Sequence, residues 1–273
     1  MQSRNPVFTR TDAFGSTSAA YAAQAATMSA EELRELYNAP AYEGVRVRDR
    51  MTIDDVVART AMTLGVLIVA AAATWYLADP ITPSHFGFLV GAALVGMAVG
   101  FFIGLKHVTN PAVILTYAAI EGVFVGLASK VLSLAVGGDS GIVAQAVLGT
   151  LCASAGMLAV YKFQVIRVTP KFQRFVVGAT LGFCLILVAN LLLSLFGVSL
   201  GVSGFGGIGL IFAILGVALA CLNLLLDFDY VEQGIAMGAP SKDAWYAAFG
   251  LTVTLVWLYI EILRIIAILR GDD

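Results

Sequence analysis

The sequence predicts an all-α fold, a polytopic membrane protein built as a seven-helix bundle. Two features of the composition support this prediction: 59% of the 273 residues are hydrophobic, and only 12% are charged. Soluble domains carry about 25% charged residues. A third feature is the distribution of charge, because most Asp, Glu, Lys and Arg residues lie in residues 1–60 or in short gaps between long apolar runs. This distribution is typical of a chain that crosses a bilayer several times.

Two regions are expected: a polar cytosolic tail over residues 1–50 and a transmembrane domain over residues 51–273. The stretch SAEELRELY predicts one short helix in the tail, because Glu32 follows Ser29 with capping-box spacing. This helix would lie on the membrane surface or dock on the loops, and a weakly ordered tail explains the same residues equally well. Because the tail is polar, we expect no cleavable signal peptide, and the first span would serve as the insertion signal.

Apolar runs of about twenty residues, the length that crosses the hydrocarbon core, mark the spanning helices. The predicted spans lie near 56–78, 85–105, 111–134, 142–161, 175–197, 205–227 and 244–268. The first follows Thr52, which has capping-box spacing with Asp55. Gly96, Gly100 and Gly104 repeat every four residues in the second span, which predicts a close approach to a neighbouring helix. The glycine-rich stretch before the sixth span predicts a flexible turn.

Basic residues gather in alternate gaps between the spans, and the positive-inside rule makes those gaps cytosolic. The set comprises Arg46, Arg48, Arg50, Arg59, Lys106, Lys162, Arg167, Lys171, Arg174 and Lys242. The N-terminus is therefore expected in the cytosol, and after seven spans the C-terminus is expected outside. Arg264 and Arg270 favour the opposite side for the C-terminus, which would follow if the last segment re-entered the membrane instead of crossing it.

Several classes of function are not supported by the sequence. The net charge of −2 gives no indication of nucleic-acid binding. The cysteines lie inside apolar runs and lack the spacing of zinc or redox motifs. A hydrolytic metal centre needs several His, Cys or carboxylate ligands, whereas His85 and His107 lie at opposite ends of one predicted span. We therefore expect no enzymatic activity, no cofactor and no permanently bound metal.

Ionisable side chains inside spanning segments are costly, and each is a candidate functional residue. Glu121 lies near the middle of the third span and has no charged neighbour in its own helix. It must be protonated, pair with a cation from another helix, or face water, and such a carboxyl suits a proton-sensitive switch. A neutral acid hydrogen-bonded across helices is the alternative interpretation. Glu261 and Arg264, three residues apart in the last span, predict an ion pair within one helix.

The sixth span ends in the acidic stretch LLLDFDYVEQG. Asp227 and Asp229 are two residues apart, so they point to nearly opposite sides of a continuous helix. Asn223 shares a face with Asp227, and Glu232 shares a face with Asp229 if the helix continues. One aspartate would then face the bundle while the other meets water or lipid headgroups. A solvated helix end is the simpler interpretation for Asp227 and Glu232.

Three stretches carry a resemblance to a known family. TYAAIEGVFVGLAS has an acidic–glycine step at Glu121 and Gly122, LDFDYVEQG places Asp229 after Phe228, and AWYAAFGLTVTLVWLYIEILRIIAIL is the last span. Together they resemble the third helix, the aspartate motif and the last helix of the Bax inhibitor-1 family, also called the transmembrane BAX-inhibitor-motif family, and in particular its bacterial branch. The resemblance covers about residues 52–270 and leaves the tail outside.

The resemblance implies a bundle whose last helix is surrounded by the other six, in the plasma (inner) membrane of a prokaryote. The activity it implies is a pH-sensitive calcium leak, with Ca²⁺ as the permeant ion. In such proteins an aspartate at the end of helix six pairs with one in helix seven, and an arginine from another helix helps to close the path. This chain has Val253 or Thr254 in the place of the second aspartate, and Asp227 is a possible replacement.

The sequence therefore predicts a membrane protein that leaks or exchanges cations through a thread of buried oxygen atoms, the ligands that Ca²⁺ prefers. The residues predicted for the ion path and pH sensor are Asp229, Asp227, Glu121, Glu261, Asn223 and Thr254, and those for the closing cation are Lys106, Arg59 and Arg264. Besides the lipid bilayer, the tail offers a contact for a protein partner. The alternative function is accordingly a non-conducting regulator that binds a membrane protease or another protein.

Overall fold

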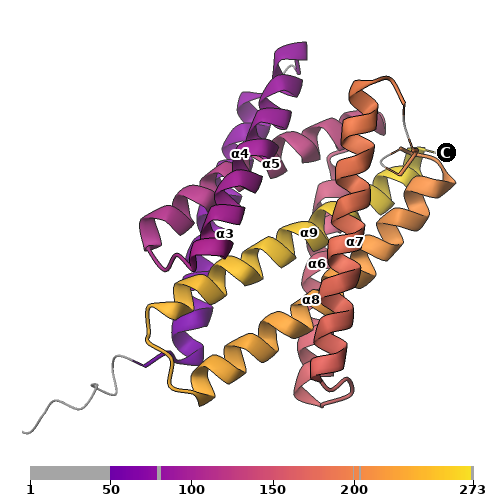
Figure 1. The fold of residues 1–273 in the computed structure, drawn as a ribbon. Helices are drawn as coiled ribbons and strands as arrows, with labels where there is room; N and C mark the ends of the chain where they lie inside the picture. Colours follow the sequence, from indigo (N-terminus) through magenta and orange to yellow (C-terminus); the bar gives the residue numbers. More distant parts are fainter. Residues whose placement is uncertain (1–49, 79–80, 199, 203, 272–273) are drawn as a thin grey trace, which may run out of the picture. The chain divides into compact units, whose positions relative to one another are not determined.

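The computed structural model describes residues 50–78, 81–198, 200–202 and 204–271, and the tail with its predicted short helix lies outside them. The described residues contain seven helices that are long and apolar enough to cross a membrane (Figure 1). They are α3 (Ile53–Leu77), α4 (Pro83–Lys106), α5 (Pro111–Ala135), α6 (Gly141–Lys162), α7 (Pro170–Leu195), α8 (Gly207–Ala236) and α9 (Asp243–Gly271). The predicted all-α fold is confirmed.

Most of the helices begin where the sequence supplies a cap. The Thr52 hydroxyl accepts a hydrogen bond from the Asp55 backbone amide, and the Asp55 carboxylate accepts one from the Thr52 amide, which completes the predicted capping box of α3. Asn110 and Thr169 cap α5 and α7, and each is followed by a proline at the first helical position. Proline is favoured there because its missing N–H would have no partner in the first turn.

The largest difference from a predicted span is at α8, which continues beyond residue 227 to Ala236; α7 also begins earlier than predicted, at Pro170. The stretch after Asp227 contains no proline and remains compatible with a helix. The helix ends at Met237, after which Gly238 adopts a left-handed conformation with φ 69° and Pro240 prevents continuation. The acidic residues of the LLLDFDYVEQG stretch therefore lie on one continuous helix.

The last helix is the central one. α9 packs against α3, α5, α6 and α8, while α4 packs mainly on α5 and α7 on α8 (Figure 1). Side chains also connect α9 to the two peripheral helices: the Trp257 ring lies 5.7 Å from that of Phe183 in α7, and the Tyr246 hydroxyl donates to the Gly104 carbonyl of α4. More of α9 is buried than of any other span among the described residues.

α3 and α5 approach each other closely enough for backbone contact. A Cβ atom on Gly122 would lie 2.7 Å from the Ala70 side chain and would overlap the Leu67 carbonyl oxygen, and one on Gly126 would lie 3.0 Å from the Thr74 side chain. Real Cβ atoms do not come so close, so glycine is required at Gly122 for the two backbones to pack. Small residues at such spacing are typical of helix pairs in membranes.

Three contacts join the helix ends that carry most of the described basic residues, so these ends lie on the same side of the bundle. The Met51 amide donates to the Ala239 carbonyl, the His107 ring stacks on Tyr246, and Tyr161 donates to a carboxylate of α8. We call this region the basic end; its described cationic residues are Arg50, Arg59, Lys106, Lys162, Arg167, Lys171, Arg174 and Lys242. The C-terminal part of α9 and the segment between α7 and α8 lie at the opposite end.

Candidate functional site

A cavity of about 580 Å³ lies among α4, α5, α8 and α9, in the half of the bundle near the basic end. Its polar lining comes from Glu121 and Tyr117 of α5, Asp227 of α8 and Thr254 of α9. The three glycines of the α4 repeat form one wall of it. Phe101, Phe124 and Phe249 supply most of the aromatic surface. We call this space the carboxylate cavity.

Glu121 reaches into the carboxylate cavity because the facing residue of α4 has no side chain. A Cβ on Gly96 would lie 2.8 Å from Glu121 Oε2. Tyr117, one turn before Glu121 on the same helix, lines the cavity beside the carboxylate. The Tyr117 ring fills the space above Gly100, whose added Cβ would lie 3.4 Å from it. The α4 glycine repeat thus makes room for a carboxylate and an aromatic ring as well as for a helix.

Asp227 enters the same cavity from α8. The Thr254 hydroxyl of α9 lines the cavity beside it and donates to the Gly250 carbonyl of its own helix. Gly250, one turn before Thr254, again leaves the space open: an added Cβ would lie 3.7 Å from Asp227 Oδ1. Asp227 Oδ2 is buried and has no hydrogen-bond partner among the residues that the structure describes. An unpartnered buried oxygen is costly, so this atom is the one that a bound water or cation would stabilise.

Asp229 and Glu232 occupy the other side of α8. Gln233 Nε2 donates to Asp229 Oδ2 at 2.6 Å, and the Tyr161 hydroxyl of α6 donates to Glu232. Both acids line a separate polar hollow of about 850 Å³ at the basic end, which the α6–α7 turn also forms with Lys162 and Arg167. Their side chains are partly or fully exposed. This is the solvated helix end expected for Glu232.

Glu261 and Arg264 form the predicted ion pair at the opposite end of the bundle. Arg264 Nη1 lies 3.3 Å from Glu261 Oε2, and Glu261 is only 4% exposed. Arg264 Nη2 also donates to the backbone carbonyls of Val202, at 2.5 Å, and Gly209, at 2.8 Å. The Glu261 carboxyl lies against Gly216 of α8, where a Cβ would be 2.7 Å from the carboxyl carbon. The pair therefore fastens the α7–α8 segment to the central helix.

The residues predicted for one ion path fall in separate places. Glu121, Asp227 and Thr254 line the carboxylate cavity, Asp229 lines the polar hollow, Asn223 bonds α7, and Glu261 pairs with Arg264. The Asn223 contact is a 2.7 Å hydrogen bond from Nδ2 to the Thr180 hydroxyl. Because α8 turns Asp227 and Asp229 to opposite sides, only Asp227 can share a site with Glu121.

The three cations predicted to close the ion path also lie in different parts of the bundle. Arg59 lies 3.7 Å from Asp55, donates to the Ser241 carbonyl and stacks over the Trp245 ring at 5.5 Å. Arg264 belongs to the pair at the opposite end. Lys106 is exposed at the end of α4, directly after a residue that lines the carboxylate cavity. Of the three, Lys106 is the one adjacent to the cavity in the chain.

Sequence reasoning missed Gly250 and Tyr117. Tyr117 precedes Glu121 by four residues, so helical spacing would have placed its hydroxyl beside the carboxylate. The role of Gly250 depends on which residue of α8 faces it, and one sequence carries no signal for that. Among the described residues, no group of three or more His, Cys, Asp or Glu side chains is placed to hold a metal ion.

In the described part of the chain, six apolar helices around a central seventh, α9, with carboxylates buried between them, define a multi-pass membrane protein. The chain belongs to the Bax inhibitor 1 like family, whose model matches residues 5–271. The match confirms the family to which the sequence motifs pointed; the bacterial branch stays a prediction. The match also includes most of the N-terminal tail, which was expected to lie outside the resemblance. A search of curated proteins found no match.

Proposed function

We propose that this protein is a pH-sensitive cation leak, with Ca²⁺ as the permeant ion and the carboxylate cavity as its ion site. The observation that carries the proposal is that Glu121 and Asp227, from different helices, line one cavity in which Asp227 Oδ2 has no partner among the described residues. Ca²⁺ takes six to eight oxygen ligands in flexible geometry. Two carboxylates with the Tyr117 and Thr254 hydroxyls offer part of that set, and water would complete it.

The same carboxylates are the proposed pH sensor. When they are ionised, they attract a cation into the cavity; when they are protonated, that attraction is lost. The flux should therefore change as Glu121 and Asp227 titrate. Lys106, which follows the lining residue Leu105 in the chain, is the proposed closing cation, since its ammonium group could compete with a permeant ion for the same carboxylates.

The proposed orientation places the basic end in the cytosol, with the N-terminus, because of the positive-inside rule. The carboxylate cavity then opens toward the cytosol, and the Glu261–Arg264 pair closes the external side. α9 is continuous over its 29 residues, long enough to cross the bilayer, which supports an external C-terminus. We also propose that the protein resides in the plasma membrane of a prokaryote and that it has no enzymatic activity and no cofactor.

The test is Ca²⁺ flux into liposomes that contain the purified protein, measured across pH 5 to 8. Glu121→Gln and Asp227→Asn remove the titrating groups with little change in size. We expect each variant to alter the leak severalfold and to flatten its pH profile. If the wild-type protein gives no leak at any pH, or if both variants keep its full pH profile, the proposal is wrong.

The alternative function, a regulator that binds a membrane protease or another protein through the tail, has one supporting observation. The residues directly before α3 contact the turn between α8 and α9. The Met51 amide donates a hydrogen bond to the Ala239 carbonyl at 2.8 Å, and Arg50 forms an isolated antiparallel β-bridge with Pro240. A partner on the tail would thus act on the turn that follows Asp227 and Asp229. Deleting residues 1–45 separates the two functions, because a leak should survive the deletion and a tail-dependent regulator should not.

A further inference from the structure

A second cavity, of about 510 Å³, lies on a different side of the central helix from the carboxylate cavity. α3 and α6 form its two walls, and α5 and α9 form its floor; we call it the α3–α6 groove. The rims belong to exposed residues, with Ile68 of α3 62% exposed and Leu151 of α6 60% exposed. Since both helices are membrane spans, the groove opens onto the surface that faces the hydrocarbon core.

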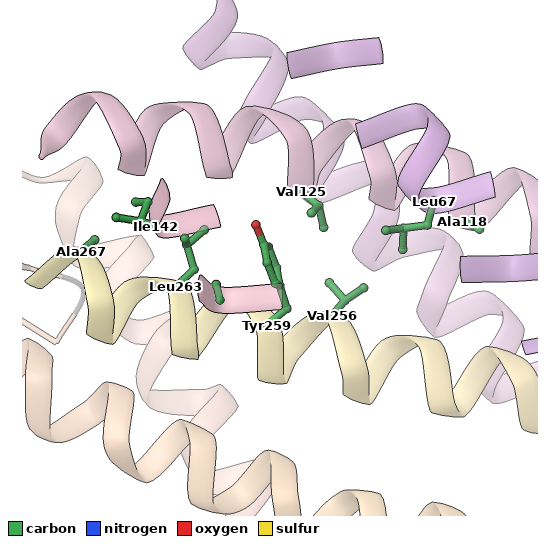
Figure 2. Close-up of a cluster of buried hydrophobic side chains, with 9 residues drawn as sticks. Leu67, Ala118, Val125, Ile142, Val256, Tyr259, Leu263 and Ala267 are labelled. Atoms are coloured by element: carbon green, nitrogen blue, oxygen red, sulfur yellow. The ribbon is translucent and has the colours of Figure 1, made fainter. Parts of the chain in front are cut away.

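The floor of the groove is apolar and its few polar groups are already paired. Figure 2 shows Val125 of α5 with Val256 and Tyr259 of α9 gathered between the two helices. The Tyr259 hydroxyl lies 2.8 Å from Ser129 Oγ, and Ser129 in turn donates to the Val125 carbonyl at 2.6 Å. Thr150 donates to a carbonyl of its own helix. These bonds leave the floor with little to offer water, and apolar cavities of this kind stay dry.

The length of the groove suits an extended hydrocarbon chain better than a compact molecule. Its lining on α3 extends from Leu64 to Tyr76, which corresponds to about 18 Å along the helix axis. That is more than half of the roughly 30 Å thickness of the hydrocarbon core. An unfilled groove would leave the side chains of its walls without contact atoms on one side, and this loss of dispersion energy favours occupancy by the surrounding medium.

One end of the groove carries an aromatic ring and a positive charge. Trp75, in the last turn of α3, lines the groove, and Lys130 Nζ lies 4.9 Å from the centre of its ring. Trp at the end of a span marks the level of the lipid headgroups. The Lys130 ammonium group, over the Trp75 ring, therefore lies at the same level.

From these observations we propose that the α3–α6 groove is a lipid site that holds one acyl chain of a phospholipid, with the phosphate group near Lys130 and Trp75. The site is independent of the proposed cation leak, since it shares no residue with the carboxylate cavity. A bound chain would fill the space between two helices that both pack on α9, and would therefore hold them in place around it.

The test uses vesicles of phosphatidylglycerol with a photoreactive diazirine in the acyl chain, followed by mapping of the labelled peptides by mass spectrometry. Two adjacent alanines of α3, both exposed, give a matched pair: Ala72 lines the groove and Ala73 does not. We expect Ala72→Trp to reduce labelling of α3, α6 and α9 at least fivefold, and Ala73→Trp to leave it at the wild-type level. Ala144→Trp, on the α6 wall, should act like Ala72→Trp and covers the case in which one variant fails to fold.

Equal labelling in the Ala72 and Ala73 variants, or labelling spread evenly over all lipid-facing helices, would overturn the proposal. The headgroup part is tested by native mass spectrometry with Lys130→Gln. This variant should retain several times less phosphatidylglycerol than the wild-type protein while retaining the uncharged diacylglycerol equally. If Lys130→Gln retains both lipids as the wild-type protein does, the phosphate assignment is wrong.

Discussion

Two regions of the bundle bury carboxylates in opposite ways. At one end, Glu261 has its own cation, Arg264, 3.3 Å away, and the guanidinium is further held by two backbone carbonyls. Near the basic end, Glu121 and Asp227 share a cavity of about 580 Å³ in which the structure describes no cationic side chain among the lining residues. In the first arrangement a cation of the protein itself faces the carboxylate, although Glu261 Oε2 and Arg264 Nε accept or donate no hydrogen bond among the described residues. In the second, no described cation lines the cavity. On this comparison rests our proposal that Glu261 supports the fold and that Asp227 and Glu121 form the ion site.

The largest effect is expected when the cation is removed from the Glu261–Arg264 pair. Arg264→Leu leaves Glu261 buried without a partner and releases the Val202 and Gly209 carbonyls. Loss of one partner of a buried pair costs about 3–5 kcal/mol. We expect a large fall in the thermal unfolding temperature of the protein in detergent. The control is Arg270→Gln, which removes a partly exposed partner of Asp139 and should cost about 1 kcal/mol or less.

A smaller loss of stability is expected where glycine permits helix contact. Gly122→Ala brings a Cβ against the α3 backbone, which cannot move aside, so overpacking should cost about 1–3 kcal/mol. Gly96→Ala meets the end of the Glu121 side chain instead, which can rotate away. We expect Gly96→Ala to keep nearly wild-type stability in thermal unfolding but to change Ca²⁺ flux. If Gly96→Ala lowers stability as much as Gly122→Ala does, the distinction between a glycine that meets backbone and one that meets a movable side chain is wrong.

Asp227→Asn should have the opposite profile to Arg264→Leu. It removes a charge that has no cation of its own, so the unfolding temperature should stay the same or rise slightly. Thermal unfolding in detergent measures this directly. A fall as large as that of Arg264→Leu would show that Asp227 is part of a structural ion pair and would remove the contrast between the two regions.

The smallest effect is expected at Asp229, on the solvated side of α8. Asp229→Asn keeps a polar side chain beside Gln233 and should change stability by no more than about 0.5 kcal/mol. Ca²⁺ flux should also remain at the wild-type level, because the polar hollow is separate from the carboxylate cavity. This outcome differs from what the family motif implied, since that motif singled out Asp229.

The seven helices could be predicted from hydropathy because the membrane imposes length and composition on every span. The Glu261–Arg264 pair could be predicted as well, because helical spacing alone determines it. Which aspartate of α8 faces the bundle depends on the rotation of the helix about its axis. A signal for that rotation was present: Gly216 and Ala220 are buried against the bundle, and Asp227 continues the same face.

Contacts between distant helices could not be predicted in the same way. That Glu121 and Asp227 line one cavity depends on how α4, α5, α8 and α9 are placed relative to one another, and one sequence gives no distances between helices. The extension of α8 to Ala236 was also missed, because hydropathy marks where the apolar run ends but not where the helix does. The separation of Asp229 from the cavity follows from that placement and could be recognised only in three dimensions.

The most direct measurement is Ca²⁺ flux through Asp227→Asn and Asp229→Asn, compared side by side in liposomes at matched protein density. The two substitutions are chemically identical and two residues apart on one helix, so they differ only in the side of α8 that they change. Our account predicts an altered leak with a flattened pH profile for Asp227→Asn and a wild-type leak for Asp229→Asn. An altered leak in Asp229→Asn with a normal one in Asp227→Asn would place the ion path in the polar hollow and contradict the account.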